Sequence, residues 1–150
     1  MDAEAGDLPD INVWLALAAP SHPHHAQARA YWERADLPRL WFNRVTMLGL
    51  VRLLCEPKVM GAATLTLSRA LRVYEYFEAV PEVGFAAEPV GCAQTFHAAL
   101  GAEPGRSPRL LTDVYLACHA RVAGMRLVTF DRDFERLNLC PVLRLSGAAH

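Results

Sequence analysis

Three aspartates stand at expected boundaries between elements of secondary structure. Asp10 follows a short extended segment, Asp113 opens a helix and Asp131 follows a β-prone run. In an α/β unit the helix runs antiparallel to the strand that it feeds, so these positions meet at one sheet edge, where such folds bind ligands. Crowded carboxylates repel unless a cation or a proton lies between them. Because oxygen ligands suit Mg²⁺ and Mn²⁺, the pattern predicts that Asp10, Asp113 and Asp131 form a catalytic metal site.

Phosphodiester hydrolysis is the chemistry that such a site favours, since a bound cation activates water and stabilises charge on phosphorus. Each acid also has a purely structural interpretation. Asp113 could stabilise a helix N-terminus, and Asp10 with Asn12 could form a turn. Asp131 could cap the short helix that follows. Their coincidence at one edge favours the joint site. Asp133 is a fourth candidate ligand or a neighbour of the ligands, with a solvated first-turn acid as the alternative.

Residues 110–134 contain the elements that position two of these acids. Thr112 is expected to cap a helix that starts at Asp113 and ends at Gly124, a residue suited to a left-handed terminal conformation. A buried strand is expected at 126–130, and it stops at Asp131.

The rest of the chain alternates between extended and helical patterns. Pro9 removes a ladder donor, so the first strand is expected to be short or irregular. Alternating strands and helices are typical of a parallel sheet covered on both faces. Further strands are expected at 8–12, 39–42, 83–87 and 141–145, and further helices at 13–19, 24–35, 46–54, 64–80 and 90–100.

Composition narrows the class of protein. The 150 residues are 53% hydrophobic and 21% charged, which suits a single domain over residues 1–150. A net charge of -1 gives no global attraction to nucleic acid or membrane, so a polyanion needs a local patch or a metal. Four widely spaced cysteines suit buried free thiols. Without a leader or a long apolar stretch, the protein is expected to be cytoplasmic, with no membrane association.

Four segments carry a family resemblance: L-P-D-I-N-V-W-L-A-L-A, R-V-T-M-L-G-L-V-R-L-L-C-E-P-K-V-M-G, T-D-V-Y-L-A and V-T-F-D-R-D-F. In this order they resemble the PIN-domain ribonucleases, in particular the VapC toxins of bacterial toxin–antitoxin pairs. The resemblance implies an α/β/α sandwich around a parallel sheet of about five strands, and Mg²⁺- or Mn²⁺-dependent cleavage of RNA. It also implies a homodimer and a cognate VapB-like antitoxin. On this pattern the metal-binding aspartates are Asp10, Asp113 and Asp131, and their polar neighbours are Asn12, Thr129 and Thr46.

One position departs from the family pattern. Many PIN domains have a glutamate directly after the threonine that corresponds to Thr46, whereas this chain has Met47. A thioether is a poor ligand for a hard cation. Glu56 lies too far along the expected helix to replace that glutamate without rearrangement. The alternative function is therefore a PIN-fold module that binds RNA or an antitoxin with little or no catalysis.

Arg44 and Arg106 are the arginines expected to contact RNA phosphates, and ordinary surface arginines are the alternative. A phosphoacceptor receiver domain also has aspartates at the carboxyl edge. This sequence lacks the paired acids after the first strand and the late lysine of such domains, so we regard that interpretation as remote.

Overall fold

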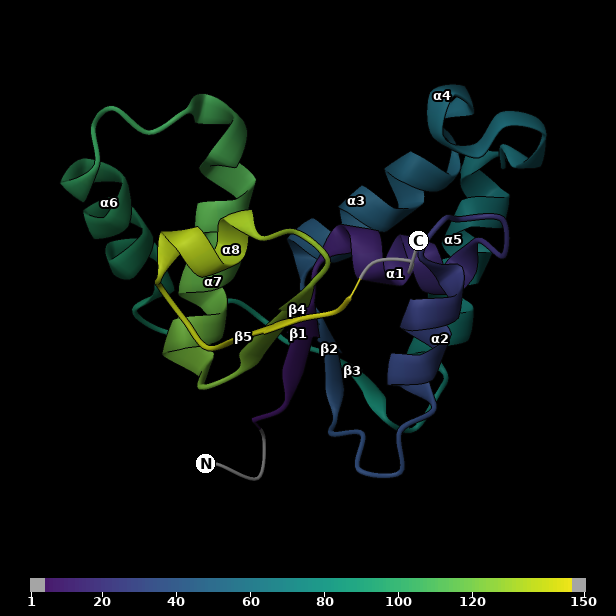
Figure 1. Ribbon diagram of the computed structural model, residues 1–150, viewed down its shortest axis with the longest axis horizontal. Coiled ribbons are helices and arrows are strands. Elements are labelled where there is room, and N and C mark those ends of the chain that lie inside the picture. Colours follow the sequence, from purple (N-terminus) through teal and green to yellow (C-terminus); the bar gives the residue numbers. More distant parts are fainter. Residues whose placement is uncertain (1–4, 147–150) are drawn as a thin grey trace.

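The computed structural model describes residues 5–146, with a five-stranded parallel sheet at its centre (Figure 1). Helices cover both faces, which confirms the predicted three-layer α/β/α architecture. The strands are β1 (Asp7–Pro9), β2 (Leu40–Phe42), β3 (Val83–Phe85), β4 (Arg126–Thr129) and β5 (Val142–Arg144). The longer helices are α1 (Ile11–Ala18), α2 (His25–Trp32), α3 (Arg44–Leu54), α5 (Leu67–Glu78), α6 (Cys92–Ala102) and α7 (Leu111–Ala123). The short ones are α4 (Pro57–Met60) and α8 (Asp133–Leu137).

Side chains of each strand alternate between two apolar layers. Leu40 and Phe42 enter the layer that contains α1, α2, α3 and α5, whereas Trp41 enters the opposite layer with α7 and α8. In β4, Val128 enters the first of these layers and Leu127 enters the second. Successive residues of a strand point to opposite faces, so short apolar runs supply both cores. The two layers lie on the right and left of the sheet in Figure 1.

The strand order β3-β2-β1-β4-β5 places a topological switch point at β1. The chain proceeds from β1 to β2 and β3 on one side, then crosses to the other side for β4 and β5. Open α/β sheets bind ligands outside the carboxyl ends of the strands at such a point. Asp10 and Asp131 follow β1 and β4, which are neighbours at this point.

Pro9 weakens one side of the central strand, as predicted. Asp10 N donates to Val128 O of β4 at 2.9 Å, and Asp7 N donates to Arg39 O, next to β2, at 2.9 Å. The backbone N–H groups along β1 point alternately to β2 and to β4. The N–H that Pro9 lacks is therefore one that would have donated to β2. Accordingly, β1 pairs with β4 at three positions but with β2 only at Asp7.

A buried charged network holds the amino end of β1. Asp7 is 2% exposed. Its Oδ1 accepts from Arg126 Nε at 3.0 Å, and its Oδ2 accepts from Arg126 Nη2 at 2.9 Å and from Tyr31 Oη at 2.6 Å. Burial, together with the Asp7 charge, raises the pKa of Tyr31. The network links β1, β4 and α2 at the edge opposite Asp10, and the sequence interpretation did not identify it.

The predicted start of α7 is wrong. The helix begins at Leu111, so Thr112 lies within its first turn and does not cap it. A 3₁₀ turn at Pro108–Leu110 runs directly into the helix, and Ser107 Oγ accepts from Arg109 N at its start. The predicted end is confirmed, because Gly124 has φ 72°. Within residues 5–146, every helix is too short or too polar to cross a lipid bilayer.

Candidate active site

Asp10 is the most deeply buried acid at the carboxyl edge, with 5% exposure. It caps α1: Oδ1 accepts from Val13 N at 3.1 Å, and Oδ2 accepts from the Thr129 hydroxyl at 2.6 Å. Burial raises the pKa of Asp10 to about 6, and the charge of Asp113 adds to the rise although both hydrogen bonds oppose it. The side chain is therefore held in one orientation in a place that disfavours its negative charge.

Thr129 connects the acids that follow the two central strands. Its Oγ1 donates to Asp10 and accepts from the backbone N–H of Asp131 at 2.9 Å. Asp131 Oδ1 in turn accepts from Asp133 N at 2.9 Å, which forms the turn into α8. Asp131 is exposed, so its second oxygen, Oδ2, has no such constraint from the turn.

Asp113 lies in the first turn of α7 and is half-buried. Burial raises its pKa to about 6, with further increases from the charges of Asp131 and Asp133, and Arg109 opposes the rise. Asp113 is therefore near enough to both Asp10 and Asp131 for their charges to interact with its own. The structure thus brings Asp10, Asp113 and Asp131 to one edge of the sheet.

The acids do not form a ready-made set of metal ligands. Across residues 5–146, no three His, Cys, Asp or Glu side chains are grouped closely enough to hold a metal ion. Asp10 turns both oxygens toward Thr129 and Val13, and Asp131 uses one oxygen in its turn. A cation at this edge would have to draw the carboxylates closer together.

The other predicted neighbours lie differently. Asn12 is exposed on α1, and it acts on Asp10 through its backbone N–H, which lowers the pKa of that acid. Thr46 is fully buried, and its hydroxyl accepts from Asn43 N at 3.0 Å in a capping box that starts α3. Thr46 therefore positions the helix start. Asn43, 2% exposed, was missed by sequence interpretation, although Asn-x-x-Thr before an apolar run is a recognisable cap signal.

Met47 and Arg44 are in contact with each other at the start of α3. Arg44 Nη1 lies 3.7 Å from Met47 Sδ, and its guanidinium covers the Phe85 ring at 4.5 Å from the centroid. Arg44 is exposed, so it stays accessible from solvent. Glu56 does not belong to α3 at all, because the helix ends at Leu54 and Glu56 precedes α4.

A hollow of about 790 Å³ is lined by Asp113 and by Glu56. Its other walls are mostly apolar residues of α1 and α3, including Ile11, Leu48 and Val51. It therefore offers an apolar surface that ends at an acidic group. The sequence did not predict that Glu56 and Asp113 share a cavity, because they are far apart in the chain.

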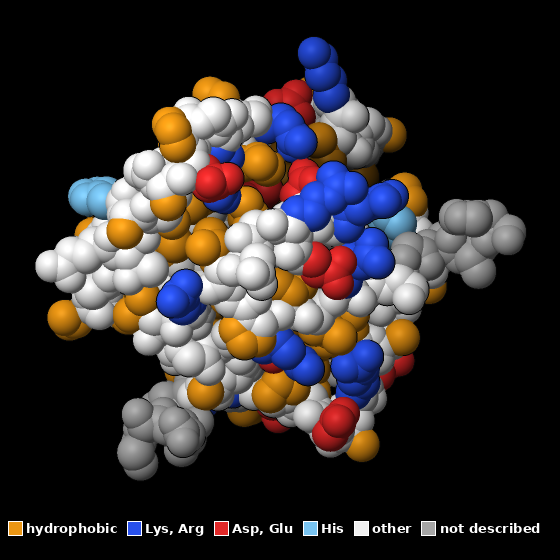
Figure 2. All heavy atoms as spheres, turned by 60° about the vertical axis from the view of Figure 1, so that its left-hand side comes forward, with side chains coloured by type: hydrophobic (Ala, Val, Ile, Leu, Met, Phe, Trp, Pro, Cys, Tyr) orange, Lys and Arg blue, Asp and Glu red, His pale blue; other side chains and the backbone are white. Residues whose placement is uncertain are grey.

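Asp133 engages arginines. Arg109 Nη1 lies 3.3 Å from Asp133 Oδ2, and Arg136 Nη1 lies 3.7 Å from Oδ1. Figure 2 shows Lys and Arg side chains gathered beside Asp and Glu on this side of the molecule. Arg106 lines the same region, with its Nη1 buried. A local cluster of arginines therefore lies around Asp133, beside the predicted acids.

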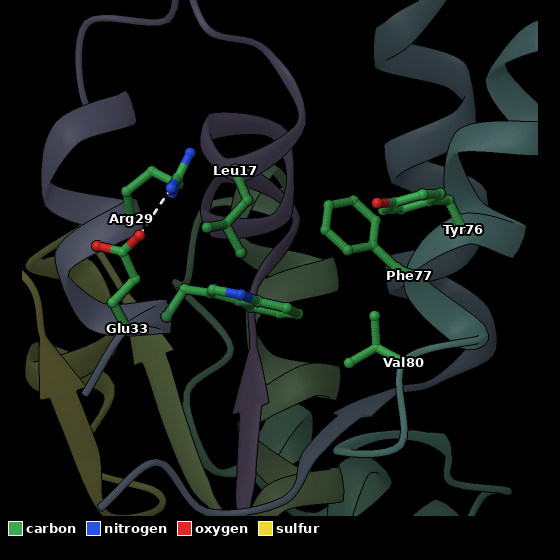
Figure 3. A pocket seen from close by; sticks show the side chains of 7 residues that line it. Leu17, Arg29, Glu33, Tyr76, Phe77 and Val80 are labelled. Atoms are coloured by element: carbon green, nitrogen blue, oxygen red, sulfur yellow. Dashed lines mark hydrogen bonds and ion pairs between the residues drawn. The ribbon is translucent and has the colours of Figure 1, made fainter. Parts of the chain in front are cut away.

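A separate hollow of about 340 Å³ lies between α2 and α5 (Figure 3). Leu17, Phe77 and Val80 point toward one another there, and Arg29 is paired with Glu33 at 2.6 Å. With an apolar lining and its charges already paired, this hollow lacks the groups that acid–base or metal chemistry needs.

Comparisons with known proteins agree with this geometry. Residues 8–138 match the family model described as PIN domain. The chain is 36% identical over 134 residues to Ribonuclease VapC41 of Mycobacterium tuberculosis, covering 86% of this chain and 91% of the relative. It is 35% identical over 125 residues to Ribonuclease VapC38 of the same species, covering 83% and 84%.

Solved structures show the same fold at lower identity. The M. tuberculosis toxin VapC20, described as cleaving the sarcin-ricin loop, superposes with a TM-score of 0.69 at 16% identity, covering 92% of this chain and 98% of that one. VapBC-1 from nontypeable Haemophilus influenzae gives 0.67 at 16% identity, covering 92% and 96%. From its matched residues and from its similarity to VapC ribonucleases, the chain belongs to the PIN domain family.

Proposed function

We propose that this chain is a metal-dependent endoribonuclease toxin of the VapC type, which hydrolyses RNA phosphodiester bonds. The observation that carries the proposal is the group formed by Asp10 after β1, Asp131 after β4 and Asp113 in the first turn of α7, in which burial raises the pKa of Asp10 and of Asp113 to about 6. The relatives named as ribonucleases support the reaction class.

The acids are chemically suited to Mg²⁺ or Mn²⁺. Burial and mutual repulsion disfavour their negative charges, and a hard cation relieves both costs through oxygen ligands. Asp10, Asp113 and Asp131 would hold it, and Asp133 is already occupied by Arg109 and Arg136. When bound, a divalent cation lowers the pKa of coordinated water and stabilises charge that develops at phosphorus.

The side chains themselves perform the positioning. Thr129 fixes Asp10 through its hydroxyl and fixes the backbone of Asp131 through its oxygen. The Val13 amide holds the other Asp10 oxygen. Arg44 and Arg106 are proposed to bind RNA phosphates on either side of the acids. Such preorganised groups orient a phosphodiester without a change in the fold.

A VapB-like antitoxin is the proposed protein partner. Solved relatives described as VapBC complexes support it, and the apolar hollow that ends at Asp113 gives an inhibitor access to the acids. A homodimer is proposed as well, with the exposed apolar side chains Leu67, Leu71 and Tyr76 of α5 as contact candidates. We place the protein in the cytoplasm, where its RNA substrate is found.

An inactive PIN-fold module that binds RNA or an antitoxin is the alternative. Two features favour it: Met47 follows Thr46 where the resemblance to PIN domains implies a glutamate, and the acids are not grouped as metal ligands within residues 5–146. The main proposal predicts RNA cleavage, whereas the alternative predicts binding of RNA or of an antitoxin with little or no turnover.

Cleavage of labelled RNA separates the two functions. Wild type, Asp10→Asn and Asp131→Asn are purified in parallel and incubated with structured RNA and Mg²⁺ or Mn²⁺, with and without EDTA. The matched control is Asp36→Asn, because Asp36 is an exposed acid outside the site. We expect wild type and Asp36→Asn to cleave in a cation-dependent way and both site variants to lose at least about 100-fold in rate.

Equal cleavage by wild type and Asp10→Asn would remove the site assignment and point to a contaminating nuclease. Absence of cleavage by all four proteins with either cation would favour the alternative. EDTA-resistant cleavage that still depends on Asp10 would refute metal dependence while retaining the site.

A further inference from the structure

A hydrogen bond between Asn43 and His119 joins the two helical layers. Asn43 follows β2 and caps α3, whereas His119 lies within α7. These two helices belong to opposite layers of the fold (Figure 1). The side-chain nitrogen Nδ2 of Asn43 lies 3.1 Å from His119 Nδ1, and the two residues are 2% and 0% exposed. Solvent therefore does not compete for this bond.

The capping box of α3 fixes which atoms of Asn43 and His119 face each other. Asn43 Oδ1 accepts from Thr46 N at 2.9 Å, and because a backbone N–H can only donate, the atom at this place must be the oxygen. The Nδ2 group of Asn43 is thereby turned to His119 as a donor, so His119 Nδ1 must accept. The proton of the neutral imidazole then lies on Nε2. The neutral ring is thus the form that fits the cap.

The protonated form of His119 does not fit this arrangement. An imidazolium ring carries a hydrogen on both nitrogens and has no acceptor, so its Nδ1–H would face the N–H of Asn43 Nδ2. A turn of the ring brings Nε2–H to the same place. A turn of the Asn43 amide would offer oxygen to His119, but it would place Nδ2 against Thr46 N, where it cannot accept. Protonation of His119 and the cap of α3 therefore exclude each other.

The surroundings of His119 favour its neutral form. Burial lowers the pKa of His119 below its ordinary value of 6.5, and the charge of Glu88, from the segment between β3 and α6, opposes this shift. The buried Nε2 has no acceptor within residues 5–146. Tyr115 donates to Glu88 at 2.6 Å, and the pKa values of Tyr115 and of Cys92 in α6 are raised, so both are neutral. Arg44 of α3 lies over the aromatic ring at the end of β3. Burial outweighs Glu88, so the ring is neutral above pH 6.5.

We propose that His119 and Asn43 form a proton-dependent switch, in which the neutral imidazole holds the cap of α3 and the imidazolium releases it. Arg44 and Met47 lie near the start of α3, and residues farther along this helix line the hollow of about 790 Å³. Release of the cap frees the start of α3 and loosens this wall of the hollow. The switch is a property of the fold and operates whether or not the chain cleaves RNA.

The titration of His119 by NMR tests the switch. The full-length chain is isotope-labelled, the imidazole signals are assigned through their backbone connections, and their shifts are followed between pH ~4.5 and ~8. His119 should show the Nε2–H form and a pKa below 6.5. In Asn43→Asp a carboxylate can both cap α3 and accept from the imidazolium, so the pKa of His119 should rise above 6.5. Asn138→Asp is the matched control, because it adds the same charge at an exposed residue that ends α8, and it should leave the pKa of His119 as in wild type.

Hydrogen exchange measures the cap itself. As the pH falls through the titration of His119, protection of the Thr46 amide should fall by about fivefold after correction for the intrinsic exchange rate. In His119→Gln the side-chain oxygen can accept from Asn43 at every pH, so this protection should stay constant. The Arg69 amide is the internal control, because Thr66 Oγ1 caps it at 3.3 Å without a histidine.

Three results would overturn the switch. One is a pKa of His119 at or above 6.5 in wild type, and another is an equal pKa of His119 in wild type and Asn43→Asp. The third is a loss of Thr46 protection in His119→Gln as large as in wild type, which would assign the loss to another titrating group. If His119→Gln gives no cooperative unfolding transition, the comparison of wild type with Asn43→Asp decides, because it leaves His119 in place.

Discussion

Replacement of Asp10 by asparagine is expected to stabilise the metal-free protein at neutral pH. Asp10 is 5% exposed, and burial raises its pKa from 3.8 to about 6. A carboxyl group with a higher pKa in the folded protein than in the unfolded chain destabilises the fold progressively as pH rises through this interval. Asparagine keeps the shape of the side chain and an acceptor for the Val13 amide, and it removes the charge.

The size of the effect follows from the two pKa values of 3.8 and about 6. Ionisation of Asp10 lowers the free energy of unfolding by about 1 kcal/mol at pH ~4.5 and by about 3 kcal/mol at pH ~8. The altered hydrogen bond with Thr129 costs the variant about 1 kcal/mol at both pH values. Between these two pH values, the stability of the variant relative to wild type should therefore rise by about 2 kcal/mol.

Urea unfolding in EDTA at both pH values measures this difference. Asp36→Asn, which removes an exposed acid, should show no comparable change with pH. A difference between Asp10→Asn and wild type that stays constant, or that shrinks as pH rises, would refute the reasoning. Mg²⁺ at pH ~8 should then stabilise wild type by about 2.7 kcal/mol at 100 times its Kd and leave Asp10→Asn nearly unchanged. Equal gains by both proteins would remove Asp10 from the ligands.

Three substitutions test the elements that position the site, each by urea unfolding. Tyr31→Phe removes the hydroxyl that donates to buried Asp7 at 2.6 Å, and should cost about 1–3 kcal/mol. Asn43→Ala removes the cap of α3 and the group 3.1 Å from His119 Nδ1, and should cost about 1–2 kcal/mol. Gly124→Ala places a Cβ at φ 72°, and should cost about 1 kcal/mol although space is open there.

Each of these has a matched control. Tyr115→Phe removes a similar hydroxyl from an exposed pair with Glu88 and should cost less than about 1 kcal/mol. Asn43→Asp keeps a capping oxygen and should retain most of the stability lost in Asn43→Ala. Gly101→Ala lies within α6 in open space and should stabilise slightly. A pair whose two members give equal effects contradicts the cause assigned to it.

The sequence predicted the layers because apolar runs and chain breakers are local signals. Strand positions were right to within a few residues, and so was the end of α7 at Gly124. The start of α7 was wrong because Thr112 is a good cap by type, while the chain enters the helix through a turn that Ser107 begins. Several side chains near a helix start can act as the cap, and the path of the preceding loop decides which of them does.

The sequence alone determined that Asp10, Asp113 and Asp131 lie at one edge, because in an alternating parallel fold the position of a residue within its element fixes the edge at which it lies. Only the tertiary structure decided where their oxygens point, what Thr129 connects, and that Asp7 is paired with Arg126 at the opposite edge. These depend on side-chain contacts between residues 119 positions apart in the chain. Local patterns carry no information on such contacts, because the packing of the two layers on the sheet sets them.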